Sequence, residues 1–87
     1  MAGTYSERRT YLEIIASILD TCRYRTKRTR VMYQCNMSSK QLEGYLDVLL
    51  KANLLLIEND SRSFLFRVSG KGKDFLKAYN NVMTMLE

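Results

Sequence analysis

Residues 38–68, SSKQLEGYLDVLLKANLLLIENDSRSFLFRV, change their hydrophobic period partway along the stretch. In the first half, apolar residues recur at helical spacing, which predicts an amphipathic helix that runs to about Ala52 and ends at Asn53. The second half holds two apolar runs, residues 54–58 and 62–68, on either side of the polar turn cluster at residues 59–61. A helix followed directly by a β-hairpin is therefore expected.

The predicted helix carries a start signal and two distinct faces. Ser38 is expected to cap its N-terminus, and Gln41 completes the pattern of a capping box. The buried face is expected to hold Leu42, Tyr45, Leu46, Leu49 and Leu50. At about 100° per residue, the opposite face is expected to carry Lys40, Gly44, Asp47 and Lys51, with Gln41 nearby.

Two further helices are predicted before this stretch. Residues 8–23 contain an apolar stripe made by Tyr11, Ile15, Ile18 and Cys22. Residues 23–30 form the most basic segment, and we interpret its first half as a loop and its second half as the start of a second, short helix. Asn36 is expected to stop that helix, because Asn tolerates the left-handed conformation. The buried side of the short helix includes Cys35, and both cysteines are interpreted as small buried apolar groups.

A last helix is predicted after the hairpin, with Ser69 as its cap. Phe75 and Leu76 are expected to pack on the domain. The apolar stripe continues beyond them, and a dimer seam would cover the patch it leaves. The expected dimerisation residues are Tyr79, Val82, Met83 and Leu86. The alternative interpretation is that this helix folds back over the first helix.

The predicted order is helix, helix, helix, hairpin, helix, which gives a mainly α fold with a β-hairpin. Three helices with a hairpin after the third are typical of a winged helix-turn-helix. We expect a flexible tail over residues 1–7, the winged helix-turn-helix domain over residues 8–70, and a C-terminal helix for packing and dimerisation over residues 71–87.

Composition limits the classes of function. The chain has 87 residues and a net charge of +5, which fits one small domain with a polyanionic partner. It has no histidine and two cysteines, so we expect no enzyme activity, no metal site and no cofactor. No apolar run approaches the roughly 20 residues that span a bilayer, so no membrane partner is expected, and no small-molecule ligand is evident. Two cysteines make a poor disulfide framework and indicate a reducing, cytoplasmic setting.

The helix order and the basic segment together indicate binding to double-stranded DNA. In a helix-turn-helix the second helix of the pair enters the major groove, so residues 38–52 are expected there. The basic segment is expected to contact phosphates, and Arg62, at the hairpin turn, to lie at a minor groove. The predicted DNA-binding residues are Arg25, Lys27, Arg28, Thr29, Arg30, Ser38, Ser39, Lys40, Gln41, Gly44, Tyr45 and Arg62.

Two carboxylates on the predicted recognition helix support a different interpretation. Glu43 and Asp47 would be repelled by phosphates unless they lie outside the contact. The alternative function is therefore a protein–protein interaction module that has a winged-helix fold and binds no DNA.

Several segments also resemble a known family. YLEIIASIL at residues 11–19, MYQCNMS at 32–38, YL at 45–46 and VSGKGKDFL at 68–76 resemble the archaeal winged-helix family typified by the ten-kilodalton Sulfolobus chromatin protein. Cys35 and Met37 stand where that family usually has Ala and Leu. The resemblance covers residues from about Arg9 to Tyr79.

That resemblance implies an archaeal or archaeal-virus source and DNA binding. The helix order and the basic segment are compatible with either a transcriptional regulator or a nucleoid-associated architectural chromatin protein. The resemblance also implies homodimers joined by an antiparallel coiled coil of the last helices. The last helix of this chain is short for an extended coiled coil, which leaves a compact dimer as the expectation.

Overall fold

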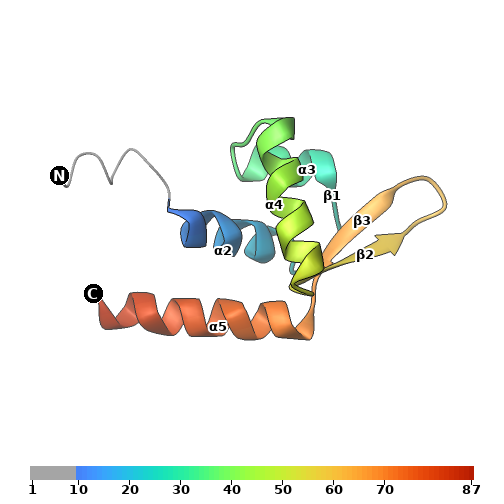
Figure 1. The fold of residues 1–87 in the computed structure, drawn as a ribbon. Coiled ribbons are helices and arrows are strands. Elements are labelled where there is room, and N and C mark those ends of the chain that lie inside the picture. Colours follow the sequence, from blue (N-terminus) through green and yellow to red (C-terminus); the bar gives the residue numbers. More distant parts are fainter. Residues whose placement is uncertain (1–9) are drawn as a thin grey trace.

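The computed structural model describes residues 10–87 (Figure 1). The tail predicted for residues 1–7 and the first two residues of the predicted first helix lie outside the described residues. The elements, in chain order, are α2 (Tyr11–Thr21), β1 (Thr26–Lys27), α3 (Arg28–Gln34), α4 (Ser39–Lys51), β2 (Leu55–Asn59), β3 (Phe64–Val68) and α5 (Gly70–Met85). The winged helix-turn-helix architecture predicted from the sequence is confirmed, with one added strand.

Side-chain caps and left-handed asparagines set the helix ends. Thr10 and Glu13 form a capping box at the start of α2, which ends at Thr21, two residues before the predicted end. Ser38 and Gln41 form the predicted capping box of α4. Asn36 and Asn53 have φ of 55° and 61°, which confirms both as helix stops.

The added strand, β1, corrects our interpretation of the basic segment. Thr26 was expected in the loop and Lys27 at the start of the second helix, but they pair with Phe66 and Leu65 of β3 in a three-stranded sheet of order β1-β3-β2. The Thr26 side chain is buried, and its hydroxyl donates to the carbonyl oxygens of Thr21 (3.1 Å) and Tyr24 (2.6 Å). A strand of two residues has no periodicity, so only this tertiary pairing reveals it.

The predicted hairpin is confirmed as β2 and β3, with shifted bounds. β2 was expected over residues 54–58 and β3 over residues 62–68, whereas the first paired residues are Leu55 and Phe64. A bond from the amide of Asp60 to the carbonyl oxygen of Ser63 (2.9 Å) closes the turn. The turn therefore takes the residues that were expected to begin β3.

One hydrophobic core joins the helices to the inner face of the sheet. Buried side chains come from α2, α3, α4 and both long strands, and α5 adds Leu76. Tyr11 is a correction to the predicted stripe of α2, because its side chain is 54% exposed while the other three members of the stripe are buried. The described structure measures 47 × 26 × 19 Å, since the hairpin and α5 project in opposite directions (Figure 1).

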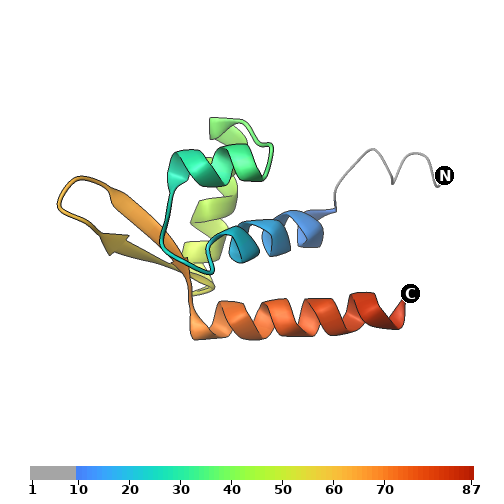
Figure 2. The same ribbon diagram turned by 180° about the vertical axis from the view of Figure 1, so that it is seen from behind.

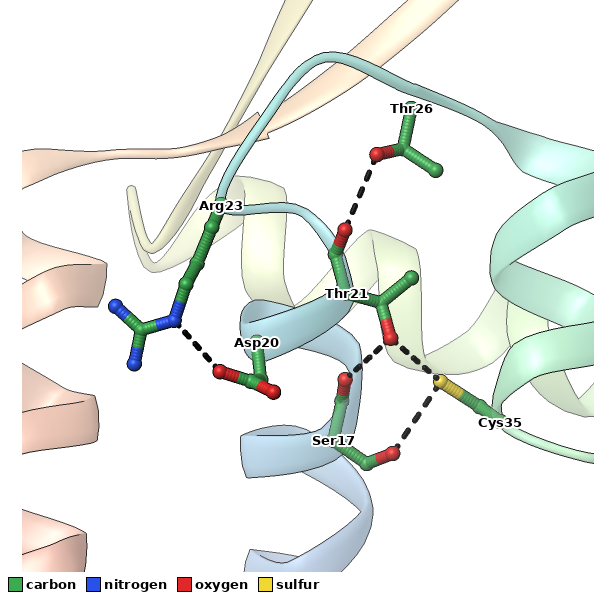
Figure 3. Close-up of polar contacts among 6 residues, drawn as sticks. All are labelled: Ser17, Asp20, Thr21, Arg23, Thr26 and Cys35. Carbon is green, nitrogen blue, oxygen red and sulfur yellow. Dashed lines mark hydrogen bonds and ion pairs between the residues drawn. The ribbon is translucent and has the colours of Figure 1, made fainter.

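Polar contacts fix the end of α2 against α3 and β1 (Figure 3). Cys35 Sγ lies 3.4 Å from the Ser17 hydroxyl, which donates to it, and 3.7 Å from the Thr21 hydroxyl. Cys22 and Cys35 are both buried free thiols, as predicted. The Cys35 contacts join the last turns of α2 to the end of α3.

Helix α5 runs alongside α2 in the opposite direction, and its last turns extend past the start of α2 in both views (Figures 1 and 2). Ser69 caps α5, and its hydroxyl also donates to the carbonyl oxygen of Asn53 (2.6 Å). Phe75 and Leu76 pack on the core as expected, and Tyr79 joins them. The first half of α5 therefore folds back over the first helix, as the alternative interpretation had it.

Candidate nucleic-acid interface

The starts of α3 and α4 are held together by one arginine. The Arg28 guanidinium donates from Nη1 to the hydroxyl of Ser39 and from Nη2 to its carbonyl oxygen, both at 2.8 Å. This fork uses the planar geometry that distinguishes Arg from Lys. Two of the predicted DNA-binding residues are thereby brought into direct contact, and the basic start of α3 is fixed beside the first turn of α4.

Two residues at the start of α4 that were predicted to bind DNA, Ser38 and Gln41, form its capping box. The Ser38 hydroxyl accepts from the amide of Gln41 (3.2 Å), and Gln41 Oε1 accepts from the amide of Ser38 (3.0 Å). A bidentate contact of Gln41 with adenine needs both its oxygen and its amino group. While the cap is intact, one of the two lone pairs of Gln41 Oε1 is used within the helix, so the amino group is the freer of its two polar groups.

The exposed face of α4 carries the remaining predicted contacts. Lys40, Gln41, Gly44 and Tyr45 border a shallow pocket of about 310 Å³ together with Val48 and Tyr11. A Cβ added to Gly44 would meet no atom within 4 Å, so this part of the helix is open to an approaching surface. Lys40 and Gly44 are exposed and Tyr45 is half-buried.

Tyr11 is a member of this surface that the sequence interpretation missed. Its ring lies 5.6 Å from that of Tyr45, centroid to centroid, at 33° between the ring planes. The periodicity of α2 placed Tyr11 in the core stripe, because a helical pattern does not show where the neighbouring helix ends. The polar hydroxyl of a tyrosine at the first turn was the available signal.

The acidic residues of α4 are arranged so that one is neutralised. Asp47 Oδ2 lies 3.1 Å from Lys51 Nζ, one helical turn away. Glu43 borders a second shallow pocket with Lys40, Gly44 and Asp47. The two carboxylates therefore lie beside Lys40 and Gly44, and one of them is paired with Lys51.

The residues predicted for the basic segment separate into two places. Lys27, Arg28 and Thr29 line a groove between the start of α3 and the hairpin. Arg30 is exposed on α3. Arg25 lies apart from them, with Nε 3.7 Å from Glu58 Oε1 on β2.

The hairpin presents Arg62 at its turn. Arg62 is exposed, and the carboxylate of Asp60, two residues before it, accepts from the amide of Ser61 (2.6 Å). On the outer face of the sheet, Arg67 Nη2 lies 2.8 Å from Glu58 Oε2. The alternation of residues 64–68 puts Arg67 on the face opposite Phe66 and Val68, but its partner follows only from the strand register.

A second groove lies between α2 and α5 and contains three of the four predicted dimerisation residues. It has a volume of about 400 Å³ and is lined mainly by apolar side chains. Its lining includes Tyr79, Val82 and Met83 of α5 and Leu12 of α2. Leu86 lies in the last turn of the chain and is 75% exposed.

The ionisable groups of the interior are thiols. Burial raises the pKa of Cys22 to about 12, and the nearby Cys35 acts in the same direction. Over residues 10–87 no group of three or more His, Cys, Asp or Glu side chains is placed to hold a metal ion. Within the same residues no helix has the length and apolar character needed to cross a membrane.

Comparisons with known proteins give one family and two similar structures. A sequence model of winged helix-turn-helix proteins matches residues 8–87. No curated protein is significantly similar to the chain in sequence. The fold is similar to that of Sso10a-2, a DNA-binding protein from Sulfolobus solfataricus, with a TM-score of 0.80 and 26% identity over 88% of this chain and 81% of that chain.

The fold is also similar to that of a multiple antibiotic-resistance repressor (MarR) from Listeria monocytogenes 4b F2365. The TM-score is 0.59 and the identity 18%, over 86% of this chain and 56% of that chain, so the likeness concerns the fold alone. The similarity to the Sulfolobus protein agrees with the family resemblance noted in the sequence. The family match includes every helix and strand described above, and the chain therefore belongs to the winged helix-turn-helix family.

Proposed function

We propose that this protein binds double-stranded DNA, with the start of α4 in the major groove and the start of α3 on the phosphate backbone. The observation that carries the proposal is the Arg28–Ser39 fork, which fixes a basic helix start beside the exposed first turn of the recognition helix. The proposed role is binding without catalysis. The DNA-binding description of the similar Sulfolobus protein supports it.

Phosphate contacts are assigned to exposed cations that flank this fork. Lys27 and Arg30 are exposed on either side of Arg28, and Arg62 is exposed at the hairpin turn. Such contacts neutralise phosphates and orient the protein, and they carry no sequence information. Arg25 is less suited to a phosphate contact than the other predicted residues, because it lies beside the carboxylate of Glu58.

Base reading is assigned to the first two turns of α4. Lys40 is the exposed cation there, and the open surface over Gly44 lets the helix backbone approach the groove. Ser39 and Tyr45 complete this surface, whereas Gln41 contributes through its amino group. Base discrimination is expected to be modest because few donors face the groove.

Two substitutions separate these roles. Arg30→Gln is expected to weaken binding to all duplexes alike and to reduce the slope of log affinity against log salt by about 1. Lys40→Ala is expected to change which duplexes are preferred in a randomised oligonucleotide selection. A Lys77→Ala variant, altered at an exposed position on α5, is the control that should match the unmodified protein.

The alternative function, a protein–protein interaction module, predicts that the chain does not bind duplex DNA. It rested on Glu43 and Asp47, and the pairing of Asp47 with Lys51 removes part of its basis. Absence of any binding to duplex DNA at low salt would favour that alternative and would contradict the proposal.

We also propose a homodimer formed through the groove between α2 and α5. Leu12 and Val82 are 51% and 55% exposed on the two walls of this groove, and an apolar surface of this kind is normally covered. The helix of a second copy would bury it. The predicted contacts Met83 and Leu86 extend the same surface toward the end of α5.

Light scattering tests the dimer. The unmodified protein is expected to show twice the mass of one chain, and Val82→Asp is expected to show the mass of one chain. Asn81→Asp introduces the same acidic side chain at the neighbouring exposed position and should leave the dimer intact. A single-chain mass for the unmodified protein would overturn the proposal.

The distribution of the protein along a genome distinguishes a transcriptional regulator from an architectural chromatin protein. A transcriptional regulator occupies sparse positions, whereas an architectural chromatin protein covers broad regions. The small number of base-reading groups on α4 supports the second arrangement. A genome-wide occupancy map is the measurement that separates the two.

A further inference from the structure

The side of α4 that lies toward the start of α2 carries an exposed apolar surface. Val48 is 42% exposed, although it belongs to the helix proposed to enter the major groove. Tyr11, the first residue of α2, is 54% exposed, and its ring lies 5.6 Å from that of Tyr45, centroid to centroid. These three side chains border one shallow pocket together with Gly44. The pocket therefore has apolar walls that come from two helices.

Two hydrogen-bond donors stand at the rim of this pocket. Lys40 and Gln41 lie in the first turn of α4 and border it. The Lys40 ammonium group is a donor without an acceptor. The Gln41 amino group is the freer polar group of its side chain, because its oxygen accepts from the amide of Ser38. Among the described residues that border the pocket, none is acidic, so the pocket offers donors beside an apolar surface.

We propose that this pocket receives the major-groove edge of a thymine, with the C5-methyl group against the apolar walls and the O4 atom facing the donors of the rim. Thymine is the base that presents an acceptor beside a methyl group in the major groove. Guanine presents acceptors alone, cytosine presents a donor, and adenine presents an acceptor and a donor. This inference rests on the proposed function and names the base that α4 reads.

Gly44 lets a base edge come close to the backbone of α4 beside the pocket. A Cβ at this position would meet no atom of the protein within 4 Å, so the protein itself has room for a side chain there. Glycine is less favourable than alanine in the interior of a helix. An approaching base accounts for a glycine at this open position, because a side chain would stand between the base and the pocket.

Uracil provides the test, because it differs from thymine only by the C5-methyl group. The two probes are a duplex of alternating adenine and thymine and the same duplex with uracil in place of thymine. The unmodified protein is expected to bind the thymine duplex about fourfold more tightly, which is the effect of burying one methyl group. Val48→Ala removes part of the pocket wall and should reduce this ratio to about twofold or less.

Met85→Ala is the matched control. Met85 is 82% exposed at the end of α5, so the substitution removes apolar surface from a helix that does not border the pocket. This variant should keep the ratio of the unmodified protein. Thermal unfolding shows whether each variant is folded. Tyr11→Ala removes the opposite wall of the pocket and carries the same comparison should Val48→Ala be unfolded.

The outcomes separate this inference from the function it rests on. Equal affinity of the unmodified protein for the two duplexes overturns the thymine assignment and leaves the proposed function standing. A thymine preference that Val48→Ala leaves unchanged also overturns the assignment, because the preference then comes from the shape or stiffness of the DNA. Failure of the unmodified protein to bind either duplex removes both proposals.

Discussion

Two glycines in helices of this protein face opposite surroundings. A Cβ at Gly44 would enter open space, whereas a Cβ at Gly72 would collide with the carbonyl oxygen of Leu54 and with the side chain of Val68. The close approach of α5 to the turn before β2 therefore requires glycine at position 72. The neighbouring Gly70 is open like Gly44.

The same substitution is expected to have opposite effects at these positions. Gly44→Ala should raise the free energy of unfolding by about 0.5–1 kcal/mol, because alanine loses less backbone entropy in a helix. Gly72→Ala should lower it by about 1–3 kcal/mol, because backbone and side chain must shift. Urea unfolding of both variants measures these changes in the free energy of unfolding. Changes of the same sign in the two variants would contradict the packing described for α5.

The buried thiol of Cys22 is expected to make stability depend on alkaline pH. Its pKa is about 12 in the folded chain and 9.0 at its ordinary value, so the unfolded chain releases the proton at a lower pH. The stabilising contribution is fully present below pH 9 and is lost as the pH rises toward 12.

A Cys22→Ala variant isolates this contribution from the titration of other groups. From about pH 8 to about pH 10.5, the free energy of unfolding should fall more steeply for the unmodified protein than for the variant. Urea unfolding across that range provides the comparison. If the free energy of unfolding fell equally steeply with pH in both proteins, burial of Cys22 would not be the cause of the loss of stability at alkaline pH.

At the scale of elements, the Arg28 fork should matter for its geometry as well as its charge. Arg28→Lys keeps the charge but loses the planar pair of donors to Ser39. DNA affinity is expected to fall about tenfold because the start of α3 is no longer fixed beside the start of α4. Arg30→Lys, at an exposed neighbouring position, is the control that should bind nearly as well as the unmodified protein.

Local signals in the sequence identified most of the elements. The capping box at Ser38 and the stop at Asn53 follow from contacts within a few residues, which a sequence displays directly. The strand β1 was missed because its two residues are defined by β3, far along the chain. The same reason hid the exposure of Tyr11 and the fork from Arg28 to Ser39.

The site was less predictable than the fold. The list of basic residues was readable from the sequence, but their grouping was not, since Arg25 faces Glu58 while Lys27 and Arg28 line the groove under the hairpin. The period of two places Phe64 on the same face as Phe66 and Val68, but it does not show that the hairpin projects beyond the helices (Figure 1) and leaves Phe64 65% exposed.

At the scale of the whole molecule, DNA affinity is proposed to come mainly from phosphate contacts. The net charge is +5, and exposed cations surround the starts of α3 and α4 and the hairpin turn. With roughly four phosphates neutralised, the slope of log affinity against log salt is expected to be about −3 to −4.

The affinity of the unmodified protein for a random-sequence duplex, measured as the salt concentration is raised, tests this claim most directly. Affinity should fall about 100-fold between about 50 mM and about 200 mM salt. An affinity that stays constant over this range, or no binding at the lowest salt, would contradict the account.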